Sequence, residues 1–271
     1  MDEHIINRCK EIAKNIRKDI VELTWIKKSG HLGGSASCVE IMAALCGILN
    51  IDPKNPKSDS RDRFILSKGQ ATMTFYSAYK QLGFFTEAEM LTFKDDDSMF
   101  SLDLVINEDR GIENSNGSLG QCLSVAMGTA LGLKIRKKTE PRVYTLIGDG
   151  ECNEGAVWEA ALFGAQQKLN NLVVIIDKNG LQYDGDTTEI LSMEPMEKKW
   201  ESFGWNAINV DGHNVEQLLD VLSKRYDKPT VIIAKTVKGK GISFAENNPD
   251  WHVNSFTQEQ YEIAKKEVSE V

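Results

Sequence analysis

The chain has 271 residues, of which 41% are hydrophobic and 27% charged, and its net charge is −8. This length and composition suit one large α/β domain or two small ones. Basic residues are mixed among a larger number of acidic ones, and the absence of a basic stripe argues against nucleic acid as a partner. No apolar run approaches membrane-spanning length and no apolar signal core is present, so we expect a cytoplasmic protein that does not enter a membrane. The five cysteines form no CxxC pair, which is typical of reduced and mostly buried thiols.

The first part of the chain predicts helices around a glycine-rich turn. Apolar residues at helical spacing over residues 5–23 predict a long amphipathic helix that ends before residue 29. The segment 29–34 contains three glycines, which would let the backbone pass close to a ligand. Ser37 and Glu40 have the spacing of a capping box, so the next helix is expected to begin there.

The middle of the chain predicts two neighbouring parallel strands. An apolar run over residues 143–147 breaks at Gly148-Asp149-Gly150. A helix-patterned segment follows from about Gly155 to Leu169, and a second apolar run over 172–176 then breaks at residues 177–180. The crossover is long enough for a helix, so the two strands should be parallel and the connection right-handed. Parallel strands end at the same edge of a sheet, which is where open α/β sheets bind ligands.

The residues at these two breaks are suited to a metal ion and a phosphate. Mg²⁺ prefers oxygen ligands; here Asp149 supplies a carboxylate, Asn179 an amide oxygen and Leu181 a backbone carbonyl. Gly150 allows backbone N–H groups to approach a phosphate, and the helix that starts near Gly155 points its positive end the same way. Either break alone could be an ordinary turn, but together on paired strands they favour a metal-diphosphate site.

Alternating strands and helices predict the fold class. Five apolar runs have the pattern of parallel strands separated by helices, at residues 64–66, 143–147, 172–176, 205–210 and 230–234. We therefore expect an α/β fold with a doubly wound, mainly parallel sheet and helices on both faces. Since no linker interrupts the pattern, residues 1–271 are expected to form a single domain.

The stretch GDGECNEGAVWEAALFGAQQKLNNLVVIIDKNGLQ resembles the thiamine-diphosphate motif of transketolases, which runs from GDG through EG and WEA to a distant Asn. The resemblance covers nearly the whole chain and is greatest to the amino-terminal half of a split transketolase. It implies thiamine diphosphate and Mg²⁺ as cofactors, and transfer of a two-carbon ketol unit from a sugar or sugar phosphate to an acceptor. The glutamate that activates the pyrimidine normally lies in another domain, for which this chain is too short. We therefore expect a carboxy-terminal, pyrimidine-binding partner subunit in an α₂β₂ assembly, and negligible catalysis by the lone chain.

The resemblance also implies roles for individual residues. It assigns catalytic contacts to the substrate to two histidines, His31 and His252. It assigns cofactor contacts to seven residues: Gln70, Gly117, Ser118, Leu119, Gly150, Glu154 and Asn179. Glu154 has two interpretations, because a charge just before a helix complements its dipole, whereas the resemblance implies a carboxylate that links active sites across an oligomer interface. A third histidine, His213, looks like a turn residue for which no catalytic role is expected.

Two departures from the family pattern bear on the substrate. Gln70 replaces a histidine; it can still form hydrogen bonds but cannot carry a proton near neutral pH. The acidic segment 95–103 stands where relatives carry a Gly-His-Pro, and it contains no histidine. It is either a solvated surface loop or a remodelled lid that repels phosphorylated sugars. Alternatives are therefore an unusual acceptor such as a carrier-bound thiol, a non-phosphorylated or sulfonated sugar donor, and a non-catalytic scaffold role.

Overall fold

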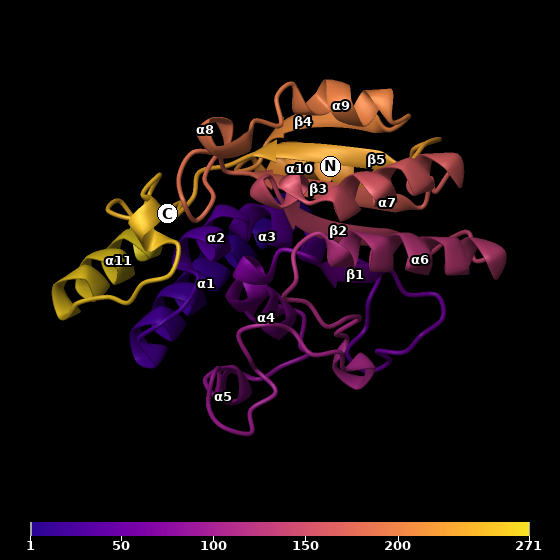
Figure 1. Cartoon of the computed structure of the whole chain (residues 1–271). Coiled ribbons are helices and arrows are strands. Elements are labelled where there is room, and N and C mark those ends of the chain that lie inside the picture. The colour runs from indigo at the N-terminus through magenta and orange to yellow at the C-terminus, as the bar shows by residue number, and fades with distance from the viewer. Residues whose placement is uncertain (1, 271) are drawn as a thin grey trace.

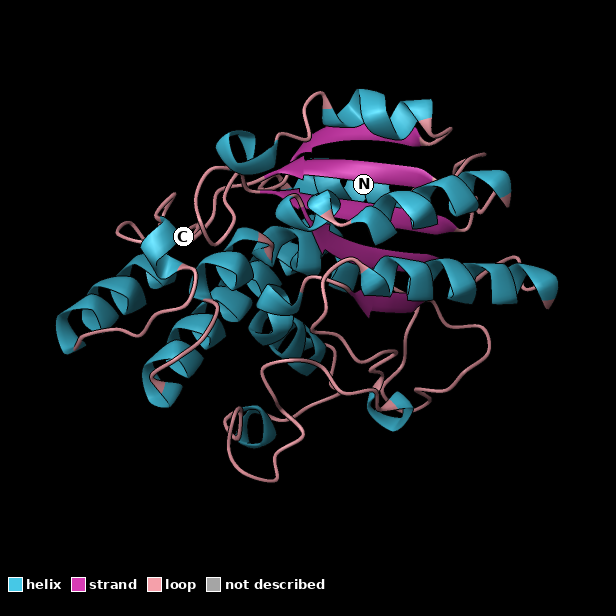
Figure 2. Cartoon of the chain, in the orientation of Figure 1, coloured by secondary structure: helices cyan, strands magenta, loops and turns pink. Residues whose placement is uncertain are grey.

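A five-stranded parallel sheet lies at the centre of the computed structural model, which describes residues 2–270 (Figures 1 and 2). The strands follow the order β1-β2-β3-β5-β4 and are all parallel to their neighbours. Their bounds are Arg63–Leu66 (β1), Val143–Gly148 (β2), Leu172–Lys178 (β3), Asn206–Asp211 (β4) and Thr230–Lys235 (β5). The five predicted strands and their parallel arrangement are therefore confirmed.

Helices cover both faces of the sheet. One face carries α1 (Glu3–Lys27), α3 (Val39–Ile48), α4 (Thr72–Gln81) and α10 (Val215–Ser223). The other carries α6 (Gln121–Ile135), α7 (Gly155–Gln166) and α9 (Met196–Ser202); Figure 1 shows α6 and α7 side by side in front of the sheet. Strand residues alternate between the two resulting cores, with Ile175 in the first and Ile176 in the second. This alternation confirms the doubly wound α/β fold.

Short helices and the end of the chain complete the structure. They are α2 (Leu32–Ser37), α5 (Glu87–Met90), α8 (Thr187–Leu191) and α11 (Gln258–Glu270). Figure 1 shows α11 alongside α1, where the rings of Tyr261 and Trp25 stack with centroids 4.7 Å apart. Among the described residues, no helix combines the length and apolar character needed to cross a bilayer. All five cysteines are buried and free, as their spacing predicts.

The predicted capping box at Ser37 and Glu40 is wrong. A helical turn already begins at Leu32, and Ser37 is its last residue. The Ser37 hydroxyl donates to the carbonyl of Gly34 at 3.1 Å, while Glu40 forms an ion pair with Arg17. The capping rule considers only local sequence, whereas here contacts with distant residues determine where both side chains bind.

The predicted crossover places the two strand ends side by side. In β2 and β3, Gly148 pairs with Asp177, and α7 connects the strands. The amide of Asp149 donates to the carbonyl of Asp177 at 3.3 Å, so the chain leaves both strands at the same edge. This edge holds the pocket described next.

Candidate functional site

A pocket of about 250 Å³ lies at the carboxyl edge of the sheet, where β2 and β3 end. Eight of the eleven predicted site residues line it: Gln70, Leu119, Asp149, Gly150, Glu154, Asn179, Leu181 and His252. Eight further residues that the sequence did not single out as site residues also line it: Gly34, Lys68, Gly148, Glu151, Asn153, Gln182, Tyr183 and Lys238. The pocket therefore brings together segments from most of the length of the chain.

Three oxygen donors converge at the two strand ends. Asp149 is 5% exposed, and its carboxylate accepts N–H bonds from Gly150 at 2.9 Å and Gly180 at 2.7 Å. The side-chain oxygen of Asn179 accepts from the Leu181 amide at 3.1 Å, which holds Asn179 and the Leu181 backbone together. Burial, with the charge of Asp177 adding to it, raises the pKa of Asp149 to about 6. A nearby cation stabilises the ionised form of such a buried carboxylate.

The donor set matches a magnesium site built from few side chains. Among residues 2–270 there is no cluster of three or more His, Cys, Asp or Glu side chains that could hold a metal ion. A carboxylate, an amide oxygen and a carbonyl are hard ligands, and Mg²⁺ commonly takes one or two protein carboxylates together with phosphate and water. The Leu181 carbonyl already faces a positive charge, because the ammonium of Lys238 donates to it at 3.1 Å.

A buried ion pair lies directly beneath these donors. Lys68 and Asp177 pair with each other, and the Lys68 ammonium also donates to the Gly34 carbonyl at 2.7 Å. Asp177 is fully buried and also accepts from Asn179 at 3.2 Å. Burial alone would raise the pKa of Asp177, but the charge of Lys68 outweighs it and lowers the pKa. Both residues stand at strand ends of the predicted sheet, so the topology could have revealed them.

Glu151 joins the β2 turn to the glycine loop that precedes α6. Its buried carboxylate accepts from the amides of Gly120 at 2.7 Å and Gly148 at 3.0 Å, and from the hydroxyl of Ser67. Burial raises its pKa. The carboxylate of Glu151, within the GDGE sequence, therefore holds this wall of the pocket in place by accepting hydrogen bonds from backbone amides.

The glycine loop at 117–119 contributes one wall of the pocket. Leu119 lines it, whereas Gly117 and Ser118 are exposed and lie outside the lining. Gly117 has a φ of +127°, a conformation that favours glycine. Glu154 is the N-cap residue of α7, makes no capping hydrogen bond, and packs against Gly120.

Two histidines meet beside the pocket. The rings of His31 and His252 have centroids 5.6 Å apart, and Nδ1 of His252 lies 3.0 Å from the ammonium of Lys238. Burial lowers the pKa of His31, and burial together with Lys238 lowers the pKa of His252 to about 3. Both imidazoles are therefore neutral near pH 7, and each has one donor and one acceptor nitrogen. In His252 the acceptor is Nδ1, which faces the Lys238 ammonium, so Nε2 carries the proton.

The acidic segment 95–103 divides into two parts. Asp95, Asp96 and Asp97 are exposed, and Asp95 pairs with Lys27 at 2.6 Å, which supports a solvated loop for this part. Asp103 instead lies beside Gly69 and Gly117: a Cβ on Gly69 would be 3.0 Å from its Oδ1, and a Cβ on Gly117 would be 3.3 Å from its Cγ. Its charge also raises the pKa of His31 against the effect of burial. A carboxylate from the segment that replaces the relatives' Gly-His-Pro therefore lies beside Gly69, which precedes the pocket residue Gln70.

Two pocket residues carry buried polar atoms without a partner. They are Nε2 of Gln182, which is a donor, and Oδ1 of Asn153, which is an acceptor. Buried polar groups are rarely left unpaired in a folded protein. Because both residues line the pocket, a polar ligand bound there is a candidate partner for these atoms.

These features define an α/β domain with a polar ligand pocket at the carboxyl edge of a parallel sheet. Residues 8–269 match the model of the family "Transketolase, thiamine diphosphate binding domain". The chain belongs to this family.

Several relatives have nearly the same length as this chain. It is 40% identical to one of the subunits of the apulose-4-phosphate transketolase of Phocaeicola vulgatus, covering 94% of this chain and 91% of the relative. It is 37% identical to 6-deoxy-6-sulfo-D-fructose transketolase subunit SqwG of a Clostridium species, with 94% of each covered. The chain thus corresponds to the amino-terminal, thiamine-diphosphate-binding subunit of split transketolases.

Longer transketolases match over part of their length. The crystal structure of transketolase from Campylobacter jejuni aligns with a TM-score of 0.88 and 27% identity, covering 99% of this chain but 43% of that one. Human transketolase is 38% identical over 93% of this chain and 40% of its own length. The chain therefore spans about two fifths of these single-chain relatives, and the remainder of them has no counterpart in it.

Proposed function

We propose that the chain is the thiamine-diphosphate- and Mg²⁺-binding subunit of a two-chain transketolase that transfers a two-carbon ketol unit from a ketose to an acceptor. The observation that carries the proposal is the convergence of Asp149, Asn179 and the Leu181 carbonyl beside the unpaired Gln182 and Asn153. When bound, thiamine diphosphate supplies the nucleophilic carbon for this reaction.

In this proposal, the residues of this chain bind the cofactor and Mg²⁺ and orient the substrate. Asp149, Asn179 and the Leu181 carbonyl hold Mg²⁺, and the Lys238 ammonium neutralises diphosphate charge. Leu119 packs against the cofactor, with Gly117, Ser118 and Glu154 at the rim and Gln70 donating to a polar group. The neutral imidazole of His31 hydrogen-bonds a substrate hydroxyl group, and His252, whose Nδ1 accepts from Lys238, donates through Nε2 to a substrate oxygen.

An apolar outer face on α6 and α7 supports the proposed partner. Val125, Leu162 and Phe163 are 44%, 62% and 42% exposed, although the opposite sides of both helices pack on the sheet. A Cβ on Gly128 or Gly132 would meet nothing within 4 Å, so another helix could approach α6 closely. We propose that the pyrimidine-binding subunit, together with a second copy of the heterodimer, covers this face in an α₂β₂ complex.

Five buried free thiols are consistent with a cytoplasmic location.

The proposal is tested by mixing the chain with its partner subunit. Titration of thiamine diphosphate with Mg²⁺ in a calorimeter is expected to show saturable binding to the complex. Ketol transfer is expected from the complex and at most about a hundredth of that rate from either chain on its own, because the cofactor pocket is completed by the partner. Binding without transfer to any acceptor would favour a scaffold role, and absence of binding would refute the proposal.

The substrate does not follow from the relatives, because two similar relatives are named for different sugars. Asp103 favours a donor that carries no negative charge near the site, such as a non-phosphorylated sugar. Its carboxylate can accept hydrogen bonds from hydroxyl groups, and it repels an anionic group that approaches within several ångströms.

Asp103→Asn is expected to raise kcat/KM for a phosphorylated ketose about fivefold and to leave kcat/KM for a neutral ketose within twofold. Removal of one charge from a solvated site changes the interaction with a phosphate by about 1 kcal/mol. The measurement is initial rates of the complete complex with both donors at low salt. Asp96→Asn, which removes a charge from the surface loop, is the control and should change neither value. An equal effect on both donors would show that Asp103 does not select by charge.

A further inference from the structure

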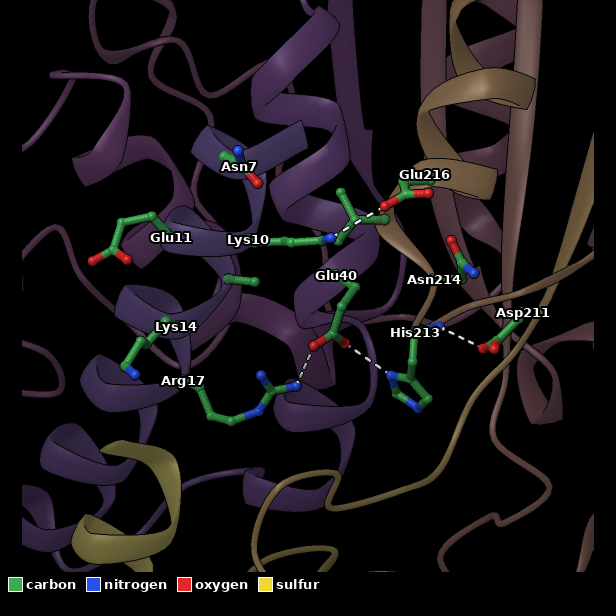
Figure 3. Close-up of a pocket in the computed structure, with 12 residues that line it drawn as sticks. Asn7, Lys10, Glu11, Lys14, Arg17, Glu40, Asp211, His213, Asn214 and Glu216 are labelled. Carbon is green, nitrogen blue, oxygen red and sulfur yellow. Dashed lines mark hydrogen bonds and ion pairs between the residues drawn. The ribbon is translucent and has the colours of Figure 1, made fainter. Parts of the chain in front are cut away.

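Away from the cofactor pocket, a depression of about 600 Å³ exposes one side of a linked triad of charged and polar side chains (Figure 3). Arg17 of α1 donates through Nη2 to Glu40 of α3 at 2.6 Å, and the second Glu40 oxygen lies 2.8 Å from Nδ1 of His213. His213 lies in the turn between β4 and α10. Arg17 and Glu40 are 2% and 8% exposed, so the triad is a buried structure rather than a surface ion pair.

The contacts of His213 fix its tautomer. The backbone N–H of Val237 donates to Nε2 at 2.9 Å, so Nε2 carries no proton and Nδ1 donates to Glu40. Burial alone would raise the pKa of Glu40, but the hydrogen bond from His213 and the charge of Arg17 outweigh it and lower the pKa. An ionised Glu40 thus accepts from both neighbours and orients the imidazole toward Val237.

The same triad holds the other end of the segment that begins at Val237. Nε of Arg17 donates to the carbonyl of Lys240 at 3.1 Å. Gly241 has a φ of +88°, and a Cβ there would lie 2.6 Å from Cδ of Arg17. The backbone at 240–241 therefore packs directly on the arginine side chain, while the backbone at 237 is bound by the histidine.

Lys238 lies between these two anchors. Its ammonium reaches the carbonyls of Leu181 at 3.1 Å and Gln182 at 3.0 Å, inside the cofactor pocket. The next residue, Gly239, has a φ of +79°, donates to the Gly33 carbonyl at 3.0 Å, and leaves no room for a side chain. The backbone around Lys238 is thus held in one conformation from several sides.

We propose that Arg17, Glu40 and His213 form a clamp on the segment 237–241 that positions Lys238 for the diphosphate of the cofactor. His213 is a positioning residue, since it acts through the Val237 backbone and not on any reacting atom. This inference rests on the proposed function, because it assigns Lys238 to a bound diphosphate. It gives a role to a histidine that the sequence suggested was only a turn residue.

Two substitutions of His213 separate the two ring nitrogens. His213→Gln can place its carbonyl oxygen near the position of Nε2 and still accept from Val237. His213→Asn can keep the donor to Glu40 but is too short to reach Val237. We expect His213→Asn to weaken thiamine diphosphate binding to the complex about tenfold. The buried N–H of Val237 loses its acceptor in this variant, and the free-energy cost of one such lost hydrogen bond corresponds to about a tenfold change in affinity. His213→Gln should remain within threefold of the wild type.

A second readout needs no cofactor. Hydrogen exchange of the lone chain should show faster exchange at Val237 and its neighbours in His213→Asn than in His213→Gln or the wild type. Arg17→Lys removes the donor to Lys240 and should give the same affinity loss. It replaces His213→Asn in the experiment if that variant proves too unstable to purify. The exposed His4→Asn is the control and should change nothing. Equal affinity and exchange in all variants would overturn the clamp, whereas a wild type that binds no cofactor would overturn the proposed function and leave the exchange result to decide the clamp.

Discussion

Replacement of Asp149 by asparagine is expected to weaken binding of thiamine diphosphate with Mg²⁺ at least a hundredfold. Asp149 is the only carboxylate among the three proposed oxygen donors, and a neutral amide cannot offset the charge of a divalent ion. The fold should tolerate the change: the charged form of Asp149 is disfavoured by burial and by Asp177, which offsets the loss of one accepted N–H bond. We therefore expect the free energy of unfolding without cofactor to change by no more than about 1 kcal/mol.

Thermal unfolding of the complex measures both expectations at once. At a hundredfold excess over its dissociation constant, the cofactor should stabilise the wild type by about 2.7 kcal/mol and Asp149→Asn by almost nothing. Asp184→Asn removes the same charge from an exposed residue close to the pocket, so it should behave like the wild type. If Asp149→Asn keeps the full stabilisation by Mg²⁺ and cofactor, the proposed metal site is wrong.

The fold could be predicted because its strands are short apolar runs that end at glycine and polar residues. In parallel sheets covered on both faces, such runs are buried throughout, and the observed β3 is buried from Leu172 to Asp177. Local rules failed where contacts between distant segments decide the outcome. Ser37 has the sequence of a helix cap, but it lies beside Asp177, which is remote along the chain.

The site could be predicted as far as the strand ends reach. Asp149 and Asn179 directly follow neighbouring strands, so the topology alone brings them together. Lys238 and Gln182 reach the pocket from long connections whose path depends on tertiary contacts. For Lys238 these include the contacts of His213 with Val237 and of Arg17 with Lys240. His213 illustrates the limit most clearly: its partners, Glu40 and Val237, come from opposite halves of the chain, and no spacing in the sequence links them.

The second large effect concerns stability. Lys68→Met is expected to lower the free energy of unfolding by about 3–5 kcal/mol, because it leaves the carboxylate of Asp177 buried without its cation. Asp177 is 0% exposed, so water cannot replace the ammonium. Such a loss is a large share of the stability of a typical domain, and it should appear as a lower midpoint in urea with an unchanged slope.

The double variant Lys68→Met with Asp177→Asn tests the cause of this loss. It removes both charges, so it should recover at least half of the lost stability. Binding of Mg²⁺ and cofactor should nevertheless be weaker than in the wild type, because Asn179 loses the carboxylate that orients its amide. Lys224→Met is the control, because it breaks an exposed ion pair in which the side chains of Lys224 and Asp220 are 53% and 61% exposed. It should lower the free energy of unfolding by at most about 0.5 kcal/mol. A loss for Lys68→Met no larger than that of Lys224→Met would mean that the buried pair contributes nothing to the fold. A double variant no more stable than Lys68→Met would mean that the lysine stabilises the protein through its packing and its bond to Gly34 rather than through its charge.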